Sequence, residues 1–239
     1  MTDIRDQHFL TDVTVIDKMI ALAEIHKTET VLDIGAGSGN ITLRIPPCKK
    51  IFAVESDKKF VAELEKIPNV TVLEGSAAKM PLAADKIISN LPFSAAESIL
   101  LRILTTPFKK AVFLLPLSLL RKLQEGTALA VLFNAFFTIT DEGDVDPASF
   151  TPVPHTKPCI MTLAPKKANA TELVIQKLWL QRDKKLKNAL RETRVQLHKA
   201  TKREAETWVD SLKLSPALLL KEIPKLTFAD YQMILSTIK

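Results

Sequence analysis

Short apolar runs alternate with longer amphipathic segments through the first half of the chain. The apolar runs predict strands near residues 30–34, 50–54, 70–74, 85–89 and 109–115. The amphipathic segments predict a first helix capped by Asp12, and further helices near residues 39–45, 57–67 and 94–104. Strand–helix alternation of this kind is typical of a parallel sheet with helices on both faces. We therefore expect an α/β fold.

The pattern changes in the second half of the chain. After Gly126, the β-rich run 129–133 predicts a sixth strand, and residues 157–163 predict a seventh as a hairpin partner at the edge of the sheet. From about residue 168 onward, leucines recur at helical spacing through a segment rich in Lys and Arg. We expect two domains, a large one over 1–167 and a small helical one over 168–239.

The positive charge of the chain is unevenly spread. The formal net charge is +6. The segment between Lys166 and Lys213 contains thirteen Lys and Arg but only six Asp and Glu, so it holds the whole surplus of positive charge. A charge run is usually a solvated helix face. A surplus confined to one segment favours contact with a polyanion such as RNA. Residues 168–239 are therefore predicted to form a basic RNA-binding domain.

Composition excludes several classes of protein. The chain has 239 residues and is 46% hydrophobic, which is enough to bury a core. No apolar run approaches the roughly 18 residues of a membrane span, and the first residues lack the pattern of a signal peptide. Cys48 and Cys159 lie far apart without metal-ligand spacing. We expect a cytoplasmic protein with no membrane segment and no metal.

Glycines follow the first predicted strand at once. The loop Gly35-Ala36-Gly37-Ser38-Gly39 lets a ligand approach the backbone closely, because glycine has no Cβ. A dinucleotide site would have the spacing G-x-G-x-x-G, but Asn40 stands where the third glycine would be. The spacing favours S-adenosylmethionine and disfavours an NAD oxidoreductase. The second strand ends at Glu55, whose carboxylate could accept both ribose hydroxyls.

The sequence Asn90-Leu91-Pro92-Phe93 ends the fourth predicted strand. Pro92 stops the strand at the sheet edge where open α/β folds bind ligands. The amide oxygen of Asn90 and the backbone carbonyl of Leu91 are two acceptors, and Phe93 is a flat apolar face. Such a set could hold the exocyclic amine of an adenine swung out of its stack. The alternative is an ordinary turn with Asn90 as a local cap and Phe93 in the core.

Five motifs recur in one order along the chain: Gln7–Leu10, Val31–Gly37, Glu55–Asp57, Asn90–Phe93 and Phe150–Pro154. Together they resemble the ribosomal RNA adenine N6,N6-dimethyltransferases, the KsgA family, in its archaeal or eukaryotic form. The resemblance covers nearly the whole chain. It implies a Rossmann-like S-adenosylmethionine-dependent methyltransferase sheet with a C-terminal helical domain. The implied reaction is methyl transfer to N6 of adenines in small-subunit ribosomal RNA or the pre-ribosomal small subunit, by a monomer.

The resemblance also implies a role for individual residues. The catalytic residues would be Asn90, Leu91, Pro92 and Phe93, and the base would stack on Phe93 and Phe150. The cofactor would contact His8, Leu10, Asp33, Gly35, Gly37, Glu55, Ser76 and Asn90. Because the attacking amine is neutral, its surplus proton can leave to water after the transfer.

Several positions depart from the family's pattern. His8 stands where Asn is usual, Ser76 where Asp is usual, and Phe93 where Tyr is usual, while the arm 2–6 is not basic. The segment 115–118 also lacks the usual polar residues. Three of these departures, His8, Ser76 and the segment 115–118, leave open a non-catalytic RNA-binding or ribosome-assembly factor on the same fold. A methyltransferase with another nucleic-acid substrate is a third alternative, because motifs like Asn90–Phe93 also serve DNA adenine methyltransferases. The two loops argue against a non-catalytic protein, which would need neither.

Overall fold

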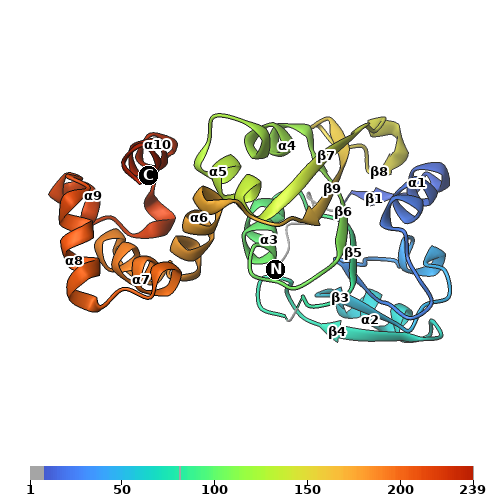
Figure 1. Cartoon of the computed structure of the whole chain (residues 1–239). Helices are drawn as coiled ribbons and strands as arrows, with labels where there is room; N and C mark the ends of the chain where they lie inside the picture. The colour runs from blue at the N-terminus through green and yellow to red at the C-terminus, as the bar shows by residue number, and fades with distance from the viewer. Residues whose placement is uncertain (1–7, 81, 239) are drawn as a thin grey trace. The chain divides into compact units, whose positions relative to one another are not determined.

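The computed structural model describes residues 8–80 and 82–238 (Figure 1). The arm 2–6 and Gln7, on which two of the sequence expectations rest, lie outside the described residues. The chain forms two compact units. The first extends to Arg121 and includes Thr138–Pro165, and the second combines Lys122–Phe137 with the residues from Lys166 onward. A domain boundary after residue 167 stays a prediction.

A seven-stranded sheet of order β4-β3-β2-β5-β6-β9-β7 forms the centre of the first unit, as expected for an α/β fold. Its strands are β2 (Thr30–Ile34), β3 (Lys50–Glu55), β4 (Val70–Glu74), β5 (Lys86–Asn90), β6 (Lys110–Pro116), β7 (Phe137–Asp144) and β9 (Pro158–Pro165). The strands from β4 to β6 pair in parallel, and β9 pairs antiparallel with β6. Residues 111–115 are all fully buried, as expected of a strand covered on both faces.

Three of the α-helices described in the first unit lie near predicted positions, whereas the last was not predicted. These helices are α1 (Val13–Ala23), α2 (Lys58–Leu64), α3 (Ala96–Ile103) and α4 (Leu117–Gln124), the last reaching past Arg121. Asp12 caps α1 by accepting hydrogen bonds from the amides of Thr14 and Val15, at 2.8 and 3.4 Å. The predicted helix over 39–45 is wrong. Only the 3-10 turn η2 (Thr42–Arg44) forms there, because Pro46 and Pro47 prevent the helix from continuing.

The predicted sixth strand over 129–133 is also wrong. These residues lie in helix α5 (Ala128–Phe136), which Thr127 caps by accepting a hydrogen bond from the Ala130 amide at 3.0 Å. The sixth strand of the sheet is β7, immediately after this helix. The seventh predicted strand exists as β9, but it lies between β6 and β7, so that β7 occupies the edge.

The second unit is helical. Besides α5 it contains α6 (Ala170–Leu180), α7 (Leu186–His198), α8 (Lys202–Ser211), α9 (Pro216–Leu219), the 3-10 turn η4 (Ile223–Lys225) and α10 (Phe228–Thr237). Capping boxes start three of these helices, in which Asn169, Thr201 and Thr227 each exchange hydrogen bonds with an acid three residues later. Trp179 and Tyr231 are buried in its core. A membrane span would need a longer and more apolar helix than any in the described part of the chain.

A two-stranded ribbon joins distant segments of the first unit. Strand β1 (Phe9–Leu10) pairs antiparallel with β8 (Phe150–Thr151), so that Phe9 lies opposite Thr151 and Leu10 opposite Phe150. The 3-10 turn η3 (Pro147–Ser149) precedes β8. This pairing brings the first of the five sequence motifs against the last.

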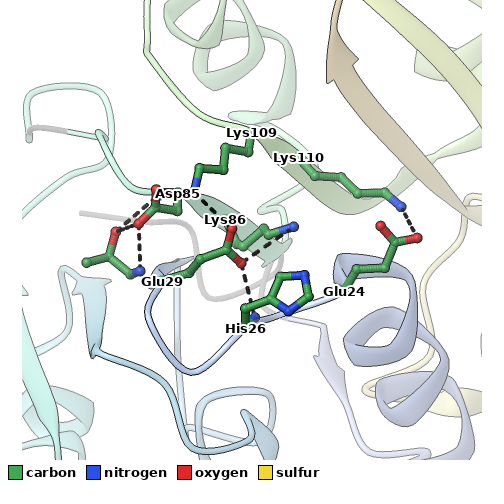
Figure 2. Close-up of polar contacts among 8 residues, drawn as sticks. Glu24, His26, Glu29, Asp85, Lys86, Lys109 and Lys110 are labelled. Atoms are coloured by element: carbon green, nitrogen blue, oxygen red, sulfur yellow. Dashed lines mark hydrogen bonds and ion pairs between the residues drawn. The ribbon is translucent and has the colours of Figure 1, made fainter.

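Charged residues gather where β2, β5 and β6 begin (Figure 2). We call them the amino-end network, which consists of Glu24, Glu29, Asp85, Lys86, Lys109 and Lys110. Glu29 and Lys86 are each only 5% exposed, and their Oε2 and Nζ atoms lie 3.7 Å apart. Lys109 bridges Glu29 and Asp85 at 3.1 Å each, and Lys110 lies 3.0 Å from Glu24. Each charge in the network therefore has a partner of opposite sign.

Candidate active site

A cleft opens at the carboxyl ends of β2, β3, β4 and β5, opposite the amino-end network. The loops after these strands line it, and β1 covers part of it. All the predicted site residues except Phe150 line this cleft: His8, Leu10, Asp33, Gly35, Gly37, Glu55, Ser76, Asn90, Leu91, Pro92 and Phe93. The structure thus gathers residues from five separate segments of the sequence.

The glycine loop needs glycine for two reasons. Gly35 and Gly37 have φ angles of 70° and 53°, in the left-handed region that favours glycine. A Cβ on Gly37 would lie 3.1 Å from a ring carbon of Phe9, and one on Gly35 would lie 3.4 Å from Cδ of Pro92. A side chain at Gly37 would therefore crowd Phe9 of β1, and at both positions it would have to adopt a backbone conformation that only glycine favours.

Asn90 ends β5 with its side chain fixed in one orientation. Its Nδ2 donates a hydrogen bond to the backbone carbonyl of His8 at 2.8 Å. Because a carbonyl can only accept, the amide nitrogen must face His8 and the oxygen must face away. That oxygen, Oδ1, is buried and has no hydrogen-bond partner among the described residues. A buried unpaired acceptor is costly unless a ligand supplies the donor.

Leu91 supplies a second acceptor beside Asn90. Its amide donates to the carbonyl of Leu114 on β6 at 3.0 Å, which anchors the turn to the sheet. Its own carbonyl accepts no hydrogen bond from any described residue. Two neighbouring acceptors are therefore open at one point of the cleft.

Aromatic rings surround the turn. The ring of Phe93 lies 5.7 Å from that of His8 and 6.5 Å from that of Phe150, the latter edge to face at 64°. Phe150 is only 1% exposed because its pairing with Leu10 carries it into the core. Its ring packs against the ring of Phe93 and does not line the cleft. Of the two predicted stacking residues, only Phe93 is at the cleft surface.

Asp33 is a buried acid at the end of β2. Its Oδ2 accepts a hydrogen bond from the Thr42 hydroxyl at 2.6 Å, whereas Oδ1 is buried without a partner among the described residues. Burial raises the pKa of the Asp33 carboxyl to about 7; the neighbouring Glu55 carboxylate adds to the rise and the Thr42 hydrogen bond opposes it. Near neutral pH this acid can therefore gain or lose a proton.

Glu55 ends β3 and connects this strand to the glycine loop. Its carboxylate accepts hydrogen bonds from the backbone amides of Gly37 and Ser56 at 2.7 Å and of Asp57 at 2.8 Å. Two carboxylate oxygens offer about four acceptor positions, so one stays open. The predicted contact with the ribose hydroxyls stays a prediction.

Ser76 lies in the loop after β4. Its hydroxyl accepts a hydrogen bond from the Ala78 amide at 3.2 Å, and the neighbouring Glu74 is exposed and does not line the cleft. Arg102 on α3 holds the loop by donating hydrogen bonds to the carbonyls of Ala77 and Met80. Sequence reasoning missed Arg102, because an arginine on a helix gives no sign of the loop that it will bind.

Asn40 is a second residue that sequence reasoning undervalued. Its Nδ2 donates to the carbonyl of Leu10 at 2.8 Å, and its Oδ1 accepts a hydrogen bond from the Ser38 hydroxyl at 3.1 Å. Asn40 therefore connects β1 to the glycine loop. The only signal for this role was an amide side chain directly after the glycines.

The charge of the cleft limits what it can bind. Of the ionisable side chains of the described residues that line it, Asp33 and Glu55 are acids, His8 is an imidazole, and none is a Lys or Arg. A pocket of this charge suits a ligand with positive charge. S-adenosylmethionine, with its sulfonium and ammonium groups, fits this requirement, whereas a pyrophosphate does not.

Comparison with known proteins agrees with this geometry. Residues 5–227 match the model of a family described as "Ribosomal RNA adenine dimethylase". The probable ribosomal RNA small subunit methyltransferase A of Methanosarcina acetivorans is 30% identical over 208 residues, which cover 79% of this chain and 77% of the relative. Its counterpart in Methanosphaera stadtmanae is 30% identical over 206 residues, covering 78% and 75%.

Two solved structures share the fold over nearly their whole length. A dimethyladenosine transferase from Plasmodium falciparum superposes with a TM-score of 0.64 at 21% identity, covering 95% of this chain and 96% of that one. The 23S rRNA methyltransferase ErmE gives 0.62 at 18% identity, covering 96% and 99%. The predicted Rossmann-like fold, class of enzyme and cofactor are confirmed. This chain belongs to the ribosomal RNA adenine dimethylase family, whose methyl donor is S-adenosylmethionine.

Proposed function

We propose that this protein methylates N6 of adenines in small-subunit ribosomal RNA, acting as a monomer on the RNA or on the pre-ribosomal small subunit. The observation that carries the proposal is the pair of open acceptors at the end of β5, Asn90 Oδ1 and the Leu91 carbonyl. An adenine N6 amine has two hydrogens, one for each acceptor. The two archaeal relatives, which are named for the small subunit, support the choice of RNA.

The acceptors orient the nitrogen for reaction. With both N6 hydrogens held by Asn90 and Leu91, the nitrogen lone pair is directed away from the ring plane. The base itself would rest on Phe93, as extruded bases rest on aromatic side chains. Positioning of this kind contributes most of the acceleration for a neutral nucleophile, because no proton needs to be removed before the attack.

S-adenosylmethionine supplies the methyl group as an electrophile on a sulfonium sulfur. The residues that would hold it are Gly35 and Gly37 through their backbone, Glu55 at the ribose, Ser76 at the adenine, and Asp33 near the positive charges. Each lines the cleft on the side of β2, β3 and β4. The Asn-Leu-Pro-Phe turn lies beside them, at the next strand of the sheet.

The second unit would hold the RNA by its phosphates. Lys199, Lys202 and Arg203 are exposed, and Arg194 lies over the ring of Trp208 at 5.1 Å from the centroid. Phosphate contacts of Lys and Arg give affinity that falls steeply with salt and does not depend on sequence. In this proposal, residues 168–239 supply affinity and the cleft selects the base.

The test is tritium transfer from labelled S-adenosylmethionine to small ribosomal subunits that lack the modification. We expect transfer to adenines, and a fall of at least about 100-fold in Asn90→Ala, since removal of one such polar contact typically costs 10²–10³ in rate. Urea denaturation of the variant is the control for folding. Salt-sensitive binding to the subunit without transfer would instead identify a non-catalytic assembly factor. Full activity in Asn90→Ala would refute the assignment of the turn.

A further inference from the structure

We propose that His8 accepts the proton that N6 of the target base loses in each methyl transfer. This inference rests on the proposed function. The proposed reaction requires that a proton leave the amine, and water alone could take it. The geometry around His8 gives this chain a dedicated acceptor beside the turn that would hold the base.

The hydrogen bonding of the ring fixes which nitrogen is basic. His8 Nδ1 lies 2.9 Å from the backbone carbonyl of Pro152. The carbonyl has no hydrogen to give, so Nδ1 must be the donor. In the neutral ring the hydrogen is then on Nδ1, and Nε2 carries the free lone pair. The structure thus selects the tautomer that can receive a proton at Nε2.

The position of His8 is fixed relative to the base site. Its backbone carbonyl accepts the hydrogen bond that orients Asn90, at 2.8 Å. Its ring centroid lies 5.7 Å from that of Phe93, on which the base would rest. The pairing of β1 with β8 fixes the residue that follows His8, since Phe9 is opposite Thr151. The backbone of His8 therefore orients the Asn90 oxygen that would accept from N6, and its ring lies next to the site of the base.

The chemistry balances with this single acceptor. The N6 lone pair forms the new nitrogen–carbon bond while the carbon–sulfur bond breaks and its electrons stay on sulfur. As that bond forms, the nitrogen gains positive charge and has one hydrogen too many. The surplus proton moves to Nε2 in the same step, so the acceptor lowers the barrier to the transfer itself. The imidazolium that results later releases a proton to water. A second transfer to the same nitrogen repeats the cycle and loses one more proton.

Other ionisable groups at the cleft are placed differently. Asp33 and Glu55 lie at the ends of β2 and β3, where Asp33 is bound by Thr42 and Glu55 by three backbone amides. The segment that packs against His8 from the other side, Phe150–Pro154, contains no charged side chain. Among the described cleft residues, His8 is the one base that stands beside Phe93 and Asn90.

The experiment is single-turnover methyl transfer at saturating S-adenosylmethionine, measured across the pH range in which histidines titrate. Wild type should speed up as the pH rises and then reach a plateau. His8→Asn and His8→Gln should transfer at least about tenfold more slowly at the plateau and lose the inflection, because neither amide can take a proton. The exposed His155, close in sequence to Pro152, gives the matched control His155→Asn, which should behave as wild type.

Cofactor affinity separates the proposal from a simpler role. The backbone carbonyl of residue 8 is the same in every variant, so the orientation of Asn90 should persist. If His8→Asn binds the cofactor more weakly but transfers at the wild-type rate once the cofactor is saturating, His8 is only a cofactor contact and the proposal fails. It fails equally if the variants keep the wild-type rate and pH profile. If wild type transfers no methyl group to adenine at all, the proposed function itself is refuted and this inference with it.

Discussion

The two ends of the central sheet treat polar groups in opposite ways. At the amino ends of β2, β5 and β6, every charge of the amino-end network has a partner (Figure 2). At the carboxyl ends, Asp33 and Asn90 each bury one oxygen that has no partner among the described residues. The difference indicates that one end serves stability while the other keeps unsatisfied groups for a ligand.

Two aspartates show the contrast within one residue type. Asp85, at the amino end, accepts hydrogen bonds from the amide and hydroxyl of Thr30 at 2.8 Å each, and these bonds with that of Lys109 lower its pKa to about 2. Asp33, at the carboxyl end, has its pKa raised to about 7, chiefly by burial. The surroundings, and not the residue type, therefore set the pKa of an acid, and with it whether the acid stabilises the fold or stays available to a ligand.

The largest effect on stability is expected from breaking the amino-end network at its buried pair. Glu29→Gln should lower the free energy of unfolding by about 3 kcal/mol, because it leaves the ammonium of Lys86 buried and uncompensated. Urea denaturation measures the change. The matched control is Glu24→Gln, which removes the exposed partner of Lys110 and should cost below about 1 kcal/mol. Equal losses in the two variants would contradict the importance of burial at this end.

Asp33→Asn should act in the opposite direction and raise the free energy of unfolding by about 1–3 kcal/mol at neutral pH. The folded-state pKa of Asp33 is above its ordinary value of 3.8, so the native protein keeps a proton that the unfolded chain loses. The resulting stabilisation is complete below pH 3.8 and is lost as the pH rises through about 7. Wild type should therefore lose stability over this range, and the variant should lose less.

Asp85→Asn is the control for that pH dependence. The folded-state pKa of Asp85 lies below its ordinary value, so its contribution is present above pH 3.8 and is lost as the pH falls toward 2. The variant should flatten the acid side of the stability curve and leave the range from pH 4 to 7 unchanged. A flattening of the same range by both variants would erase the distinction between the two ends.

The sequence predicted the carboxyl end of the sheet better than the rest of the fold. Glycines, acids and the Asn-Leu-Pro-Phe turn follow strands directly, so the order of parallel strands alone brings them together at one edge. Residues 30–34 and 70–74 are strands with the predicted bounds. The run 129–133 was mistaken because an apolar segment fits a buried strand and a buried helix equally well, and only the cap at Thr127 separated them.

The features that the sequence could not predict depend on contacts between residues that are far apart in the chain. Phe150 was placed at the cleft by its motif, yet its pairing with Leu10, 140 residues away in the chain, puts it in the core. The unpaired oxygens of Asp33 and Asn90 likewise became visible only from distances. The same holds for the tautomer of His8, which depends on the carbonyl of Pro152.

The smallest expected effect concerns cofactor affinity at the carboxyl end of the sheet. Ser76→Asp adds a charged acceptor at the carboxyl end, where the family usually has one. A charged acceptor contributes about 1.5–3 kcal/mol against roughly 1 kcal/mol for a neutral one, so the dissociation constant for S-adenosylmethionine should fall about fivefold. Isothermal titration calorimetry measures it, with Glu74→Gln as a control that should change nothing, since Glu74 does not line the cleft. The unfolding free energy of the unliganded protein should stay within about 0.5 kcal/mol, because an exposed charge in a loop has little effect on stability. An unchanged dissociation constant would mean that Ser76 does not contact the cofactor, and that acceptors at this end matter only where they are buried.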